Sequence, residues 1–144
     1  MATMADIAKK VGVSKGTVSK AINGAPDISE TLRKTILETA VELGYLRARR
    51  GAARTLAILV ENMGYTKPED FGTDIVTGFR QMAEPAGYNV QVTELSVDLE
   101  RTTRYDEYML QQGYLGALLL GLSLEDPWLE DFRTSHTPAV LYDN

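Results

Sequence analysis

The sequence predicts an all-α domain followed by an α/β lobe with a doubly wound, parallel sheet. In the first third of the chain, apolar residues recur at helical spacing in three short stretches. Further along, continuous apolar runs typical of buried strands alternate with amphipathic helical stretches. This alternation implies parallel strands joined by crossover helices. We therefore divide the chain into residues 1–46, a linker of residues 47–55, and a lobe of residues 56–144.

Charge is distributed unevenly between the two units. The net charge is −5, yet residues 1–54 have ten Lys and Arg against five Asp and Glu, whereas residues 55–144 have five against fifteen. A basic module joined to an acidic one indicates that only the first binds a polyanion such as nucleic acid. The acidity of the whole chain therefore does not exclude DNA binding. No apolar run approaches the length of a membrane span, so we expect a cytoplasmic protein, associated with the nucleoid.

The first helix is predicted from its two ends and its apolar face. Thr3 and Asp6 have the spacing of a capping box, and Gly12 stands where the helix should stop. Its apolar face consists of Met4, Ile7, Ala8 and Val11.

A second short helix follows directly, with Ser14 as its N-cap and Gly24 just beyond its end. Its apolar face consists of Val18, Ala21 and Ile22. Its other face consists of Lys15, Gly16, Ser19, Lys20 and Asn23. Two helices joined by a tight turn predict a helix-turn-helix, whose second helix enters the major groove. The alternative for this cationic face is an ordinary solvated helix surface.

A third helix completes a small core. Pro26 interrupts the chain, Ser29 is placed as an N-cap, and the apolar periodicity runs to about Leu43 before Gly44. Three helices of this length bury one small core.

The sequence from Asp6 to Gly24 resembles the DNA-binding signature of the lactose/galactose-repressor (LacI/GalR) family. The resemblance continues through Ile28-Ser29-Glu30, Arg33 and Glu42-Leu43-Gly44-Tyr45. It implies a transcriptional regulator, typically a repressor, that binds a near-palindromic operator in double-stranded DNA as a homodimer. It also implies that a small, sugar-like effector modulates this binding.

The resemblance assigns DNA contacts position by position. Lys15, Gly16 and Lys20 match the base-facing positions of the family. Phosphate contacts fall on Thr3, Ser14, Thr17, Ser19 and Asn23. Because Gly16 has no side chain, we expect reduced direct readout at one base pair, or room for a thymine methyl.

The linker departs from the family pattern. Family members usually have a Pro-Asn pair and a hinge helix whose leucine wedges into the minor groove, and here the Pro-Asn pair and the leucine at the wedge position are absent. The basic residues that remain are Arg47, Arg49, Arg50 and Arg54. They either bind phosphates and a narrow minor groove, or form a basic linker without fixed contacts.

The lobe is predicted from alternating strands and helices. The expected strands are Leu56–Val60, Asn89–Leu95, Leu115–Gly121 and Pro138–Tyr142. The expected helices are Thr73–Ala86, Leu99–Gln112 and Leu124–Arg133. The segments Gly78-Phe79, Gly87-Tyr88 and Thr137–Leu141 resemble the first of the two lobes of the family's periplasmic-binding-protein-like sensor. Because family chains run to more than twice this length, we expect an incomplete lobe with an uncovered sheet edge.

Ligands of doubly wound folds bind beyond the carboxyl ends of the strands. The candidate effector residues there are Asn62, Tyr65, Phe71, Asp74, Ser123 and Asp143. Aromatic, carboxylate and amide groups suit a sugar, although any polar loop supplies the same types.

The sequence indicates neither an enzyme nor a cofactor. It has no cysteine, a single histidine (His136), and no nucleophile elbow or phosphate-binding glycine motif. One acidic run has the composition of a metal site, but we interpret it as a solvated helix face: Glu125, Asp126, Glu130 and Asp131. Two functions remain, an effector-responsive repressor or a DNA-binding fragment that does not sense. A third class, a protein-interaction module with a purely structural helix-turn-helix, predicts salt-insensitive behaviour toward DNA.

Overall fold

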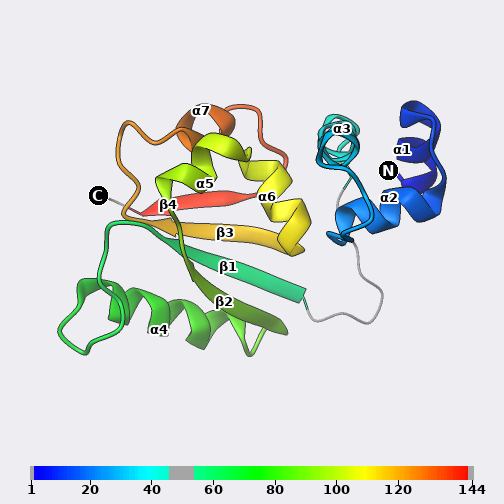
Figure 1. Cartoon of the computed structure of the whole chain (residues 1–144). Coiled ribbons are helices and arrows are strands. Elements are labelled where there is room, and N and C mark those ends of the chain that lie inside the picture. Colours follow the sequence, from blue (N-terminus) through cyan, green and yellow to red (C-terminus); the bar gives the residue numbers. More distant parts are fainter. Residues whose placement is uncertain (1, 46–53, 143–144) are drawn as a thin grey trace.

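The computed structural model describes residues 2–45 and 54–142, and it consists of two units (Figure 1). The first unit contains α1 (Met4–Val11), α2 (Lys15–Ile22) and α3 (Glu30–Glu42). The second is a sheet with helices on both faces. The predicted fold class, a helical domain followed by a parallel α/β lobe, is confirmed. Among the described helices, none is both long and apolar enough to cross a membrane.

The helices of the first unit begin and end at the predicted signals. The Thr3 hydroxyl accepts the N–H of Asp6 at 3.3 Å, and the Asp6 carboxylate accepts the N–H of Thr3 at 2.9 Å, which completes the capping box. Gly12, with φ +83°, ends α1 in the left-handed conformation that glycine adopts without a steric cost. Ser14 and Ser29 cap α2 and α3 through their hydroxyls. The local chemistry of the sequence therefore suffices to place these ends.

The apolar faces of the three helices meet in one core. Ile7, Val18, Ala21 and Ile36 are fully buried in it. At about 25 cal/mol per Å² of buried apolar surface, so small a core leaves little margin for a lost contact.

The lobe contains a four-stranded parallel sheet in the order β2-β1-β3-β4. The strands are β1 (Arg54–Val60), β2 (Tyr88–Glu94), β3 (Tyr114–Leu120) and β4 (Ala139–Tyr142). The helices are α4 (Phe71–Ala83), α5 (Val97–Thr102), α6 (Tyr105–Gln112) and α7 (Trp128–Asp131). Helix α4 covers one face of the sheet, and α5, α6 and α7 cover the other (Figure 1). The strand order reverses between β1 and β3, which is where ligands of such folds bind.

Three predictions about the lobe are wrong in detail. The single helix expected over 99–112 is broken into α5 and α6, because Thr103 is extended and the indole N–H of Trp128 donates to its carbonyl at 2.8 Å. The N–H of Tyr105 is bound by the Asp131 carboxylate at 2.9 Å, which satisfies the first turn of α6. The helix expected over 124–133 is only α7, and β1 begins at Arg54 rather than at the predicted Leu56.

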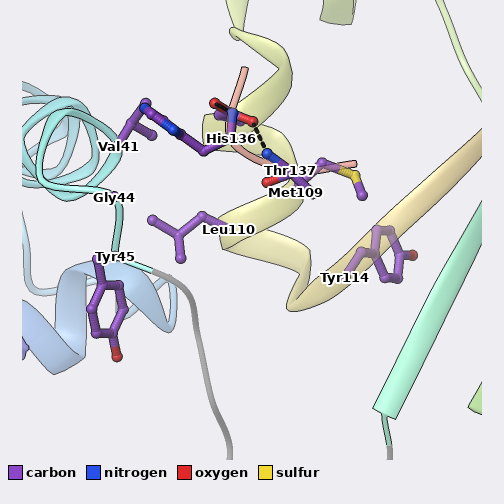
Figure 2. A pocket seen from close by; sticks show the side chains of 9 residues that line it. Val41, Gly44, Tyr45, Met109, Leu110, Tyr114, His136 and Thr137 are labelled. Carbon is purple, nitrogen blue, oxygen red and sulfur yellow. Dashed lines mark hydrogen bonds between the residues drawn. The ribbon is translucent and has the colours of Figure 1, made fainter. Parts of the chain in front are cut away.

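The two units contact one another through α6. Leu110 belongs to the buried cluster of the helical domain, not to either core of the sheet. Figure 2 shows Leu110 extending from α6 toward the end of α3, beside a small cavity that Val41, Gly44 and Tyr45 also line. His136, the single histidine of the sequence, has an exposed side chain at the rim of this cavity.

Candidate nucleic-acid interface

Helix α2 is amphipathic, with one apolar face and one polar face. Val18 and Ala21 are fully buried, whereas Lys15, Gly16 and Lys20 are exposed. The three base-facing positions predicted from the sequence therefore lie on one accessible surface. The helix is backed by a closed core, so it can enter a groove without unfolding.

Gly16 leaves this surface open without being required by the fold. A Cβ built at Gly16 would meet only the Ser14 hydroxyl, at 3.8 Å, which is ordinary contact. Glycine in a helix interior costs about 1 kcal/mol relative to alanine. The packing of the domain therefore does not require this glycine, and position 16 leaves the exposed face of α2 without a side chain.

Lys20 is held in place by an acidic neighbour. Its Nζ lies 2.6 Å from Oδ2 of Asp27, in the loop between α2 and α3, and both side chains are more than half exposed. The hydrogen bond from Lys20 holds the pKa of Asp27 below its ordinary value. Because exposed pairs contribute little to stability, this contact positions Lys20 more than it stabilises the domain.

The hydroxyl and amide groups near α2 already have local partners. Ser14 and Thr17 lie 3.0 Å apart through their hydroxyl oxygens, and Asn23 Nδ2 donates to the Ser19 carbonyl at 2.9 Å. Thr3 is engaged in the cap of α1. The Thr3 hydroxyl also donates to the Asp6 carboxylate at 3.1 Å, and one of the Ser14 and Thr17 hydroxyls donates to the other. A phosphate contact through one of these donating hydroxyls therefore requires the local hydrogen bond to be exchanged.

The predicted arginines divide into two sets. Arg47, Arg49 and Arg50 lie outside the described residues. Arg54 is the first residue of β1, where its guanidinium lies 4.3 Å from the ring centroid of Tyr88 and donates to the Tyr88 hydroxyl at 2.6 Å. The structure thus gives Arg54 a partner within the lobe.

Residues 3–48 match the family described as bacterial regulatory proteins, lacI family. The chain carries the helix-turn-helix domain of the lacI family. It is 30% identical to the HTH-type transcriptional regulator IpsA of Corynebacterium glutamicum, over 98% of this chain and 41% of that protein. It is 25% identical to catabolite control protein A of Priestia megaterium, over 96% of this chain and 42% of that protein. It is 28% identical to the transcriptional repressor CytR of Escherichia coli, over 92% of this chain and 40% of that protein.

The chain thus spans about two fifths of the length of these curated relatives. Among solved structures, it is similar to a transcriptional regulator CelR–cellobiose complex, with 26% identity, a TM-score of 0.46, and coverage of 98% of this chain and 42% of that one. It is also similar to a lac repressor dimer bound to operator and the anti-inducer ONPF, with 20% identity, a TM-score of 0.44, and coverage of 97% and 44%.

The lobe that follows the lacI-family domain places the predicted effector residues along the carboxyl edge of its sheet. Asn62 follows β1 and donates to the Gly121 carbonyl at 3.2 Å, and Ser123 follows β3 on the exposed surface. Tyr65 donates to the Glu94 carboxylate at 3.3 Å, so its hydroxyl is engaged at the end of β2.

The remaining predicted effector residues are dispersed along this edge. Phe71 is 66% exposed, and its ring centroid lies 6.0 Å from that of Tyr142 at the end of β4. Asp74 is exposed on the first turn of α4, and Asp143 lies outside the described residues. The described members of this set thus lie along one rim of the sheet.

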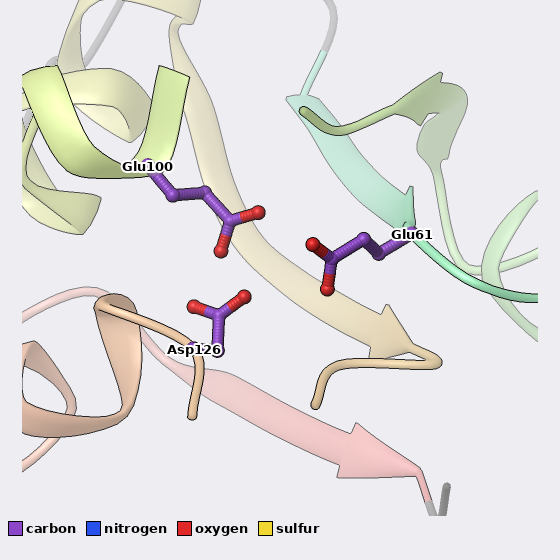
Figure 3. A group of neighbouring side chains, drawn as sticks. All are labelled: Glu61, Glu100 and Asp126. Carbon is purple, nitrogen blue, oxygen red and sulfur yellow. The ribbon is translucent and has the colours of Figure 1, made fainter. Parts of the chain in front are cut away.

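Sequence reasoning missed a carboxylate cluster on the same rim. Glu61, Glu100 and Asp126 come together from three segments, with one carboxylate oxygen of each within 4.8 Å of the others (Figure 3). Burial raises the pKa of Glu61, and the negative charge of Asp126 adds to the shift. Burial also raises the pKa of Glu100 to about 9, with further contributions from Asp126 and Glu61.

Asp126 was predicted to belong to a solvated acidic run, and this interpretation is wrong for Asp126 and Asp131 but agrees with the exposure of Glu125 and Glu130. Asp126 is buried, while Glu125 and Glu130 are exposed. Asp131 instead binds the N–H of Tyr105. A signal was present in the sequence, because Glu61 directly follows a strand buried on both faces.

Proposed function

We propose that this chain is a sequence-specific DNA-binding transcriptional regulator of the LacI/GalR type, with α2 as the helix that enters the major groove. The single observation that carries the proposal is the exposed Lys15–Gly16–Lys20 surface on a helix whose opposite face is closed by a core. The match of residues 3–48 to the lacI family supports it. Lysine ammonium groups reach guanine acceptors or phosphates, and the nearby hydroxyls fix the register.

The proposal is tested by the salt dependence of DNA binding. Fluorescence anisotropy of a labelled duplex of mixed sequence should show affinity that falls steeply with salt, because each phosphate that the protein neutralises contributes about −0.9 to the slope of log K against log salt. Selection from a random duplex library should then yield one preferred sequence. Salt-insensitive association, or no preferred sequence, would refute the proposal and favour a purely structural helix-turn-helix.

We further propose that the regulator acts as a homodimer on a near-palindromic operator, as a repressor. A two-fold protein reads two copies of a short half-site, which multiplies its specificity. The measurement is the stoichiometry on the selected duplex: two chains per duplex with symmetric half-sites support the dimer, and one chain per duplex contradicts it.

The lobe is proposed to bind a small, sugar-like effector at the carboxyl edge of its sheet. Polar and aromatic groups occupy this rim at Asn62, Phe71 and Ser123, next to the reversal of strand order between β1 and β3. Thermal melts of residues 1–144 across a sugar library, beside a longer chain of the relatives' length, test this proposal. A shift in both supports sensing by this lobe. A shift in the longer chain alone supports the second candidate, in which this stretch binds DNA without sensing.

A further inference from the structure

Three carboxylates converge where the order of the strands reverses. Glu61 directly follows β1, Glu100 lies on α5, and Asp126 lies between β3 and α7. Figure 3 shows the three side chains pointing toward one another from these separate segments. One oxygen of each lies within 4.8 Å of the others.

The cluster is buried, and its oxygens lack partners. Glu100 is only 3% exposed, and neither of its carboxylate oxygens has a hydrogen-bond partner among the described residues. The same holds for Glu61 Oε2 and Asp126 Oδ2 within the described part of the chain. A buried ionised group without a partner is strongly unfavourable, so each such carboxylate needs either a proton or a bound cation.

The three groups cannot satisfy one another while they are ionised. A carboxylate only accepts hydrogen bonds, and like charges at this separation repel. The described ion pairs of the chain join other residues, and no lysine, arginine or histidine of the described structure forms one with these three carboxylates. What the cluster lacks is therefore positive charge.

The backbone holds the three groups in place. The N–H of Glu61 donates to the Leu120 carbonyl at 3.0 Å, which ties the start of this side chain to the end of β3. The N–H of Trp128 donates to Asp126 Oδ1 at 2.8 Å, which leaves Oδ2 directed into the cluster. Ser96 caps α5 through the N–H of Leu99 and thereby fixes the turn that carries Glu100. These backbone contacts hold the three carboxylates close to one another.

We propose that Glu61, Glu100 and Asp126 bind one divalent cation, of which Ca²⁺ fits best. The three oxygens all lie within 4.8 Å of one another, close enough to converge on one ion. Ca²⁺ is bound by six to eight oxygens in a flexible geometry and accepts several carboxylates at once, which suits three carboxylates from separate segments. Mg²⁺ requires a tighter octahedron, with oxygens at about 2.0–2.1 Å, and retains more water. The bound ion would link β1, α5 and the segment before α7. This proposal departs from the expectation from sequence that the chain has no metal site.

Calorimetric titration of the chelator-treated 144-residue chain with CaCl2 tests the proposal, with MgCl2 in parallel at the same ionic strength. We expect one Ca²⁺ per chain, with a Kd of about 1 mM or tighter, and weaker binding of Mg²⁺. Terbium, which occupies calcium sites, provides a local readout: excitation of Trp128, the only tryptophan in the sequence, should sensitise terbium emission because its backbone contacts Asp126.

Two matched variants locate the ion. Glu100→Gln keeps the shape of the side chain and should weaken Ca²⁺ binding at least tenfold. Glu125→Gln removes the same charge at an exposed position one residue from Asp126 and should leave the Kd within twofold. If Glu100→Gln is misfolded by near-ultraviolet circular dichroism, Asp126→Asn replaces it.

Three results would overturn the proposal. The first is that the wild-type chain shows no saturable Ca²⁺ binding, and the second is that Glu125→Gln and Glu100→Gln weaken Ca²⁺ binding equally. The third is that the wild-type chain binds no Ca²⁺ and the Glu100→Gln variant has a higher Tm than the wild type. The last result would show that the carboxyl groups share protons. Because the titration contains no DNA, its outcome does not depend on the proposed DNA binding.

Discussion

Lys20 Nζ lies 2.6 Å from Asp27 Oδ2, so the proposed base-reading lysine of α2 is already paired with an acid of its own domain. Both side chains are more than half exposed, and a phosphate or a guanine can compete for the ammonium group. The pair orients the Lys20 side chain along one side of α2. It also places the negative charge of Asp27 beside the proposed DNA surface. We therefore expect Asp27 to oppose DNA binding in general while it restricts the orientation of the Lys20 side chain.

Asp27→Asn should strengthen binding to mixed-sequence DNA severalfold at low salt, because it removes a like charge beside the phosphates and releases Lys20. The same variant should discriminate less between the selected operator and mixed sequence. Anisotropy titrations on the two duplexes measure both effects. Glu42→Gln is the matched control, since it releases Lys10 from an equivalent exposed pair elsewhere in the domain. Equal effects of the two variants would show that only net charge matters.

Lys20→Ala should cost about 1–3 kcal/mol of operator binding and relax the preference at one base pair. Binding to a set of single-base operator variants provides the measurement. Lys10→Ala removes the same charge from α1 and should weaken all duplexes alike. An unchanged sequence preference in Lys20→Ala would contradict the assignment of Lys20 to base reading.

Leu110→Ala should uncouple the two units. Leu110 extends from α6 into the buried cluster of the helical domain, and truncation of a buried leucine costs about 2–5 kcal/mol. Trp128 reports only on the lobe, whereas far-ultraviolet circular dichroism reports on both units. Urea unfolding followed by the two probes should coincide in the wild type and separate in the variant. Met82→Ala, at a position 79% exposed on α4, should leave the curves coincident.

Glu107→Gln should raise stability more at pH 8 than at pH 5. Burial raises the pKa of Glu107, and Glu38 of α3 adds to this shift, while Arg104 and Lys34 oppose it and Asp131 reinforces it slightly. A raised carboxyl pKa means that the folded state holds the proton more tightly, so stability is lost as the pH rises above the ordinary value of 4.5.

The amide of the Glu107→Gln variant does not ionise, so the variant does not lose stability in this way as the pH rises. The measurement is the difference in Tm between Glu107→Gln and the wild-type chain across this pH range. This difference removes the contributions of other buried carboxyl groups, which both proteins share. Exposed Glu125→Gln should show a difference that does not change with pH. A flat difference for Glu107→Gln as well would contradict the role of its burial.

The features that could be predicted from sequence are those decided within a few residues. Thr3, Ser14 and Ser29 cap the three helices of the first unit as predicted, because a cap needs only a hydroxyl and the N–H groups of the next turn. The buried strands were predictable from their continuous apolar runs. The break between α5 and α6 could not be predicted from sequence. It depends on hydrogen bonds of the Thr103 carbonyl to Trp128 and of the Tyr105 N–H to Asp131, and both partners come from a later segment.

The sequence by itself determined the class of both units, the ends of the helices in the first unit, and the exposed face of α2 on which the proposed DNA contacts lie. The predicted contact residues stay predictions, since none has been tested on DNA. Only the tertiary structure decided that Lys20 is paired with Asp27, that Leu110 joins the two units, and that Glu61, Glu100 and Asp126 meet. The physical reason is that helical period and capping act over one or two turns, whereas these contacts depend on how the chain brings distant segments together. Charge patterns along the chain describe the solvated surface, and the fold selects which of those charges become buried.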